Sequence, residues 1–93
     1  DADEVFTSWG KETALSFTEQ DIREKLEHFA SVEHFGLVVR AKGIVPCKDG
    51  GWIHFDYTPD EIEIRKGSAA PTGLLCVIGA NLNVELVEKL FEG

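Results

Sequence analysis

The sequence of 93 residues contains no methionine and only two cysteines. A primary translation product begins with methionine, so we expect either a processed form or a domain cut from a larger protein. Because no signal segment is in view, we favour the excised domain. Cys47 and Cys76 stand too far apart for a metal-binding motif, and two cysteines make no disulfide framework. We therefore expect two free thiols in a reducing compartment, which favours a cytoplasmic location.

Basic residues are also scarce, with 9 lysines and arginines against 17 acidic residues and a net charge of −8. A field of this sign repels phosphate backbones, which argues against nucleic acid as a partner. The longest apolar runs, such as residues 73–80, are too short to span a bilayer, so no membrane partner is expected.

The most informative stretch is residues 36–57, whose pattern predicts two strands joined by a tight turn. Alternation places Leu37, Val39 and Ala41 on one face of the first strand, with Val38, Arg40 and Lys42 on the other. In the second strand Ile53, Phe55 and Tyr57 alternate with Trp52, His54 and Asp56. The glycines at 50 and 51 supply the positive φ angles that such a turn requires. Gly43, inside a strand pattern, is typical of a β-bulge.

The rest of the chain predicts further strands and two helices. Residues 5–9 alternate as a strand that weakens at Gly10. Strict alternation over residues 61–65 predicts another strand, and the continuous apolar run 74–78 predicts a strand buried on both faces. One helix should begin after the N-cap Thr18 and end before Gly36, and a second should follow the N-cap Asn83. The expected apolar stripes are Ile22, Leu26, Phe29 and Ala30 on the first helix, and Val84, Val87, Leu90 and Phe91 on the second.

These elements predict an α+β domain over residues 1–93, in the order β-α-β-β-β-β-α. The helix between the first two strands makes those strands parallel, and the short turns after them make an antiparallel meander. We expect a mostly antiparallel sheet of about four to five strands with two amphipathic helices on one face, a ferredoxin-like variant.

No residue pattern in the chain is typical of catalysis. A phosphate-binding loop of the G-x-x-x-x-G-K-[ST] type is absent. His28, His34 and His54 are scattered, and only His54 and Cys47, on opposite arms of the hairpin, have an outside chance of meeting. Arg40 and Lys42 share a strand face and could receive a phosphate or a partner's carboxylate, or could form an ordinary solvated face.

Four segments resemble the C-terminal domain of CobW-like proteins, the family named for cobalamin synthesis. They are residues 5–9 (VFTSW), 39–43 (VRAKG), 52–57 (WIHFDY) and 75–82 (LCVIGANL), which occur in the order found in the family. The resemblance implies a parent protein whose N-terminal GTPase domain carries the phosphate loop and a Cys-x-Cys-Cys metal site. Members are regarded as GTP-driven chaperones for zinc, cobalt or related metal centres.

By this resemblance the chain is a non-catalytic docking module. Its expected partners are the GTPase domain of the same chain and, through it, a client metalloprotein. GTP and the divalent metal would belong to the parent, so no catalytic, cofactor-binding or metal-binding residue is assigned here. Arg40 and Lys42 are the candidate docking residues.

Two other classes stay open. A small ferredoxin-like enzyme of the acylphosphatase type would need an arginine in an anion-binding loop after the first strand, where this chain has Gly10, Lys11 and Glu12. A stand-alone metal carrier would need paired cysteines in C-x-x-C spacing.

We predict that the purified chain hydrolyses no GTP, because it lacks the loop whose backbone N–H groups would hold the phosphates. Phosphate release should not exceed that of a buffer blank. Turnover above the blank, in a preparation free of contaminating GTPase, would contradict the docking-module hypothesis.

Overall fold

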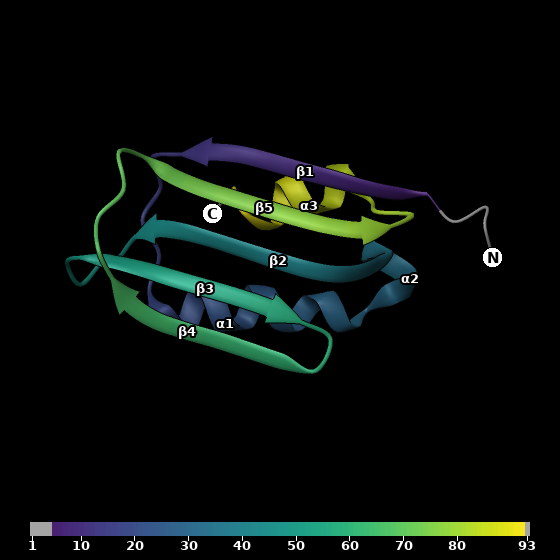
Figure 1. Cartoon of the computed structure of the whole chain (residues 1–93), viewed down its shortest axis with the longest axis horizontal. Helices are drawn as coiled ribbons and strands as arrows, with labels where there is room; N and C mark the ends of the chain where they lie inside the picture. Colours follow the sequence, from purple (N-terminus) through teal and green to yellow (C-terminus); the bar gives the residue numbers. More distant parts are fainter. Residues whose placement is uncertain (1–4, 93) are drawn as a thin grey trace.

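The computed structural model describes residues 5–92 and shows a five-stranded sheet with helices packed on one side (Figure 1). The strands are β1 (Phe6–Thr13), β2 (Leu37–Pro46), β3 (Trp52–Thr58), β4 (Glu61–Gly67) and β5 (Gly73–Ala80). The helices are α1 (Glu19–Glu27), the 3-10 helix η1 (His28–Ala30), α2 (Val32–Phe35) and α3 (Val84–Leu90). The predicted α+β class and antiparallel sheet are confirmed.

The strands lie in the order β1-β5-β2-β3-β4, and every neighbouring pair is antiparallel. The last strand of the chain, β5, enters between β1 and β2. The first two strands therefore run parallel, as predicted, but do not touch. The meander β2-β3-β4 is also as predicted. Five residues, 47–51, connect β2 to β3, and two residues, Pro59 and Asp60, connect β3 to β4. Gly50 and Gly51 have φ values of 103° and 77°.

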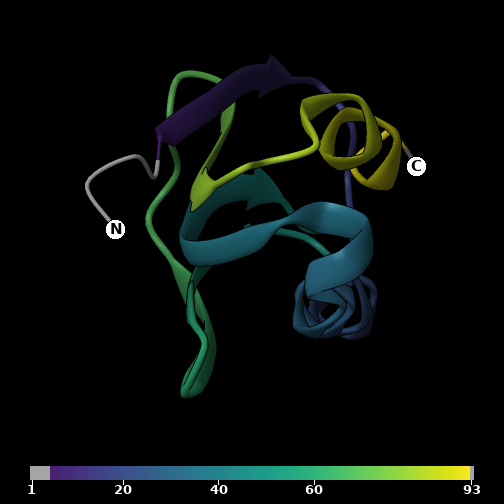
Figure 2. The same cartoon turned by 90° about the vertical axis from the view of Figure 1, so that its right-hand side faces the viewer.

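All helices lie on the same side of the sheet, as the side view shows (Figure 2). The first predicted helix begins at Thr18, whose hydroxyl accepts from the Asp21 N–H while the Asp21 carboxylate accepts from the Thr18 N–H. This capping box satisfies two amide groups that the helix itself leaves unpaired. The helical region does end before Gly36, but as α1, η1 and α2 rather than as one helix.

The core lies between the sheet and the helices and is rich in aromatic rings. Phe91, which follows α3, stacks on Trp9 of β1 and Phe55 of β3, with ring centroids 5.9 and 6.3 Å apart. It also contacts Phe29 of η1, whose ring meets Tyr57 edge-on at 5.5 Å. The Phe91 ring thus links β1, β3 and η1 within the core.

The predicted faces of β2 are partly wrong. Val38 is buried in the core, whereas Leu37 is exposed and Val39 half-buried. The register with β5 shifts between Val38 and Arg40, so an extra residue there reverses the alternation. The bulge is not at Gly43, where a side chain would instead meet the Phe55 ring at 2.6 Å.

Burial of β5 on both faces is also wrong. Leu75 and Val77 are buried against the helices, but Leu74 and Ile78 are 44% and 36% exposed. No helix covers the second face within residues 5–92, so alternate residues of this apolar strand face outward.

Smaller corrections concern the ends and stripes of elements. Strand β1 continues through Gly10 to Thr13, because its pairing with β5 continues to Gly73. Ala30 and Val84 are exposed and Leu90 is half-buried, while the other members of both predicted stripes are buried. In the part of the chain described, no helix is long and apolar enough to cross a membrane.

We predict that Phe91→Ala lowers the free energy of unfolding by about 3–5 kcal/mol, because it removes a buried ring that three other aromatic side chains contact. Val84→Ala, at the start of α3 and 40% exposed, should change it by roughly 0.5 kcal/mol or less. Urea denaturation measures both variants. Equal midpoints would show that α3 does not stabilise the core.

Candidate functional site

The candidate site is the sheet face opposite the helices, which we call the open face. It carries alternate side chains of all five strands, and it includes half of the exposed large hydrophobic side chains of the described residues. These four are Phe6 on β1, Leu37 on β2, and Leu74 and Ile78 on β5. Apolar side chains on three adjacent strands form a continuous area, which on a protein surface is typical of an interaction site.

Arg40 lies on the open face and is fixed by Asp56 of the adjacent strand β3. Its Nε and Nη2 donate to the two carboxylate oxygens at 3.1 and 2.9 Å. This bidentate pair lowers the pKa of Asp56 below its ordinary value, and the charges of Lys42 and Arg65 lower it further by a smaller amount. The pair holds the Arg40 side chain along the sheet rather than leaving it free in solvent.

Lys42 lies on the same face, opposite Cys76 of β5 and Asp56 of β3 in the strand register. Its side chain is exposed, and among residues 5–92 no carboxylate oxygen lies within 4.0 Å of its Nζ. Arg40 and Lys42 are therefore brought together as the sequence predicts, but only Arg40 is held by a partner within the chain.

A hollow of about 560 Å³ lies between these residues and extends over β5, β2, β3 and β4. Ile44, Leu74 and Cys76 give it apolar surface, and Lys42, His54 and Arg65 give it polar or charged surface. The His54 ring contacts the backbone oxygen of Ser68 at 2.8 Å. Of the predicted residues, His54 thus shares the hollow with Cys76 and not with Cys47, which is buried in the core.

The titratable side chains do not gather into a metal centre in the described part of the chain. No group of three or more His, Cys, Asp or Glu side chains converges within residues 5–92. His28 lies beside the Phe35 ring and His34 beside Ser31, both remote in sequence from His54. A closed zinc site needs about four ligands, so these positions do not fit one.

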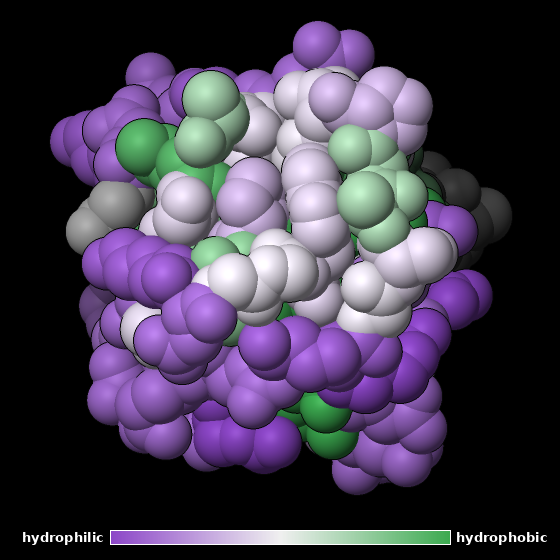
Figure 3. Space-filling model, turned by 90° about the vertical axis from the view of Figure 1, so that its left-hand side faces the viewer, coloured by the Kyte–Doolittle hydropathy of each residue, from purple (hydrophilic) through white to green (hydrophobic). Residues whose placement is uncertain are grey.

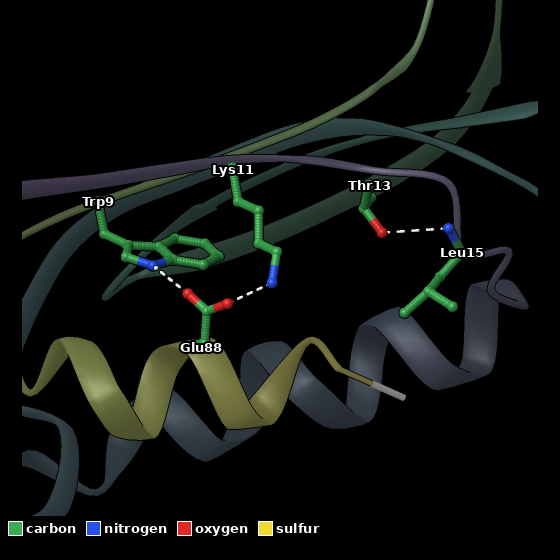
Figure 4. Close-up of polar contacts among 5 residues, drawn as sticks. All are labelled: Trp9, Lys11, Thr13, Leu15 and Glu88. Carbon is green, nitrogen blue, oxygen red and sulfur yellow. Dashed lines mark hydrogen bonds and ion pairs between the residues drawn. The ribbon is translucent and has the colours of Figure 1, made fainter.

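On the helix side, Glu88 of α3 joins the helix to strand β1 (Figure 4). One carboxylate oxygen accepts from the Trp9 indole N–H at 3.1 Å, and the other pairs with the Lys11 ammonium. These contacts lower the pKa of Glu88, Lys11 contributing most and Trp9 next. Sequence reasoning missed this carboxylate, because no local pattern connects positions so far apart in the chain.

Figure 3 shows the end of the molecule at which the loop of residues 68–72 joins β4 to β5. Pale side chains of weak hydropathy gather in its middle, a few separate hydrophobic patches lie among them, and hydrophilic side chains cover most of the margin.

Comparison with known proteins identifies the family. The model of the cobalamin synthesis protein cobW C-terminal domain matches residues 6–93. The chain belongs to this CobW C-terminal family. Its membership confirms the resemblance of the four sequence segments.

Two solved structures share the fold of this CobW C-terminal chain. They are the Zn(II)-bound YjiA GTPase from E. coli, at 16% identity and a TM-score of 0.72, and a Zn(II)-bound triple mutant of YjiA, at 15% and 0.73. Each match covers 92% of this chain and 28% of the YjiA chain. No curated protein sequence matches.

We predict that Glu88→Gln lowers the free energy of unfolding at neutral pH and that the loss disappears in acid. A carboxylate whose pKa is lowered by folding stabilises the fold above its ordinary pKa, 4.5 for Glu88, and this contribution is lost as the pH falls through the lower folded value. Denaturation of parent and variant from about pH 7 downward should show the two curves converging.

Glu12→Gln is the matched control, because Glu12 lies on β1 next to Lys11 but has no ion pair within the described residues. It should keep the parent's pH dependence. If Glu88→Gln and Glu12→Gln give the same pH profile, the bond between Glu88 and β1 does not contribute in solution.

Proposed function

We propose that the chain is the C-terminal accessory module of a CobW-like, GTP-dependent metal chaperone of the cytoplasm. In this proposal the open face docks on the GTPase domain of the same parent chain and so relates the nucleotide state to metal delivery, for cobalamin synthesis or for a client metalloprotein. The module itself is non-catalytic and holds no cofactor.

The observation that carries the proposal is the one-sided sheet. A sheet face with exposed apolar side chains on three adjacent strands is stable in water only at a cost, which a second layer would remove. The described residues provide that layer on one face alone. A docking partner for the other face accounts for why Leu74 and Ile78 are apolar where polar residues would serve an isolated module better.

The comparison with YjiA supports a larger parent. The chain spans 28% of the length of that GTPase, so YjiA has further polypeptide beside the part that resembles this chain. Zinc is bound in the YjiA structures. Because the residues described here bring no metal-ligand group together, we assign metal and GTP to the remainder of the parent.

Within the open face, Lys42 is the better candidate for a direct ion pair with the partner. Arg40 already holds Asp56, and breaking that bidentate pair would offset part of any new attraction. We therefore infer that Arg40 shapes the docking surface, while Lys42 supplies the charge that an acidic group of the partner neutralises.

An enzyme of the acylphosphatase type gains no support from the geometry. Residues 14–18 (ALSFT), which connect β1 to α1, contain no arginine that could hold an acyl phosphate. The two arginines with described ion pairs on the sheet, Arg40 and Arg65, lie in β2 and β4.

The test is binding in trans between this chain and the GTPase portion of the parent protein. We predict that replacing both Arg40 and Lys42 by alanine weakens the complex about two- to thirtyfold, since an exposed charge contributes roughly 0.2–1 kcal/mol. Titration calorimetry measures the affinity, and GTP turnover with and without the chain measures the functional effect.

The matched control replaces Arg23 and Lys89 by alanine. These exposed residues of α1 and α3 lie on the helix side and give the same change of charge. The control pair should bind like the parent. Absence of binding by the unaltered chain, or equal weakening by both pairs, would refute docking through the open face.

A further inference from the structure

The hollow on the open face differs in charge from the rest of the chain. Three cationic side chains, Arg40, Lys42 and Arg65, line it against a single carboxylate, that of Asp56. The chain as a whole carries a net charge of −8. A local positive excess favours a partner segment that carries carboxylates.

Its apolar surface lies on β5 and β2, next to one cation without an ion pair among residues 5–92. Ile44 and Leu74 are direct neighbours across the β2–β5 ladder, and Cys76 follows two residues further along β5. Lys42 lies on β2 between Cys76 and Asp56, while Arg65 lies on β4, opposite His54 in the register and 3.8 Å from the Glu63 carboxylate. A ligand that fits this arrangement has apolar side chains on one face and a carboxylate beside them.

The backbone pairing of the sheet decides the conformation of that ligand. The hollow lies over β5, β2 and β3, and each of these strands has a hydrogen-bonded neighbour on both sides. An extended peptide binds by adding to a free edge, and here only β1 and β4 are edges. Over the hollow, therefore, recognition depends on side-chain packing, which is how helices cover sheets.

Size agrees with this conclusion. Strands are about 4.8 Å apart, so three neighbouring strands present a width of about 10 Å. An α-helix with its side chains is about 10–12 Å in diameter. One helix laid over β5, β2 and β3 would cover the apolar surface and bring its polar side chains to Lys42 on β2.

We propose that the hollow of the open face binds an amphipathic α-helix with acidic flanks, its apolar side chains packing on Ile44, Leu74 and Cys76 and a carboxylate pairing with Lys42. This deepens the proposed function, on which it rests for the role of the open face, by naming the partner's chemistry. If the proposed function is correct, this helix belongs to the GTPase portion of the parent protein.

The test uses two synthetic helical peptides of roughly 18 residues, long enough to keep helical structure. The first has leucine along one face and glutamate along both flanks, and the second has lysine in place of every glutamate. Fluorescence anisotropy gives the affinities, and ¹H–¹⁵N chemical shifts of the labelled chain locate the site. The acidic peptide should bind at least about tenfold more tightly, and less so at high salt.

Two substitutions test the two halves of the proposal, each with a matched control. Lys42→Glu should weaken the acidic peptide roughly tenfold, and Lys89→Glu, the same change on α3, less than about twofold. Leu74→Ser should weaken it about fivefold, and Val32→Ser, at a similarly exposed site on α2, should not. Circular dichroism verifies that each variant remains folded.

Several outcomes would overturn the proposal. These are equal affinity for both peptides, no binding of the acidic peptide at about 1 mM, equal effects of a variant and its control, or shifts confined to an edge strand or to the helix side. If the peptide binds as expected but the GTPase portion does not, the proposed function fails and this inference stands. If the GTPase portion binds the parent chain through the open face but the acidic peptide does not bind, the proposed function stands and this inference fails.

Discussion

The structure depends on the constraint that every helix of the described chain packs on the same face of one sheet. Phe91 contributes to this arrangement, because its ring lies against Trp9, Phe29 and Phe55 and so links β1, η1 and β3. The Lys25 ammonium donates to the Leu90 carbonyl at 2.8 Å and connects α1 to the end of α3. With the helices on one side, the opposite face of the sheet is left uncovered by the described residues.

The two faces consequently differ in the kind of interaction that they offer. On the helix side Glu88 is engaged within the chain by both Trp9 and Lys11. On the open face Asp56 engages Arg40, whereas Lys42 lies beside Cys76 of β5 and has no described carboxylate oxygen within 4.0 Å of its Nζ. The described residues therefore complete a core on one side of the sheet and leave the other side exposed.

Several local features could be predicted because their causes are local. The cap at Thr18, the glycine turn at 50–51 and the alternation of Ile53, Phe55 and Tyr57 each depend on residues close together in sequence. The predicted docking pair, Arg40 and Lys42, does share a face, since both lie beyond the bulge. The bulge was not predicted, because Val38 and Val39 are equally apolar and only the pairing of β2 with β5 determines which side chain faces the core.

The sequence alone determined the α+β class, the hairpin, the helix starts and the family resemblance, because capping, turn chemistry and alternation are written in neighbouring residues. Tertiary structure decided what depends on contacts between distant segments. The insertion of β5 between β1 and β2 placed Leu74 and Ile78 in solvent, although a continuous apolar run predicts burial on both faces. It also placed Cys76, and not Cys47, in the same hollow as His54, because strand order rather than sequence distance determines which side chains share a surface.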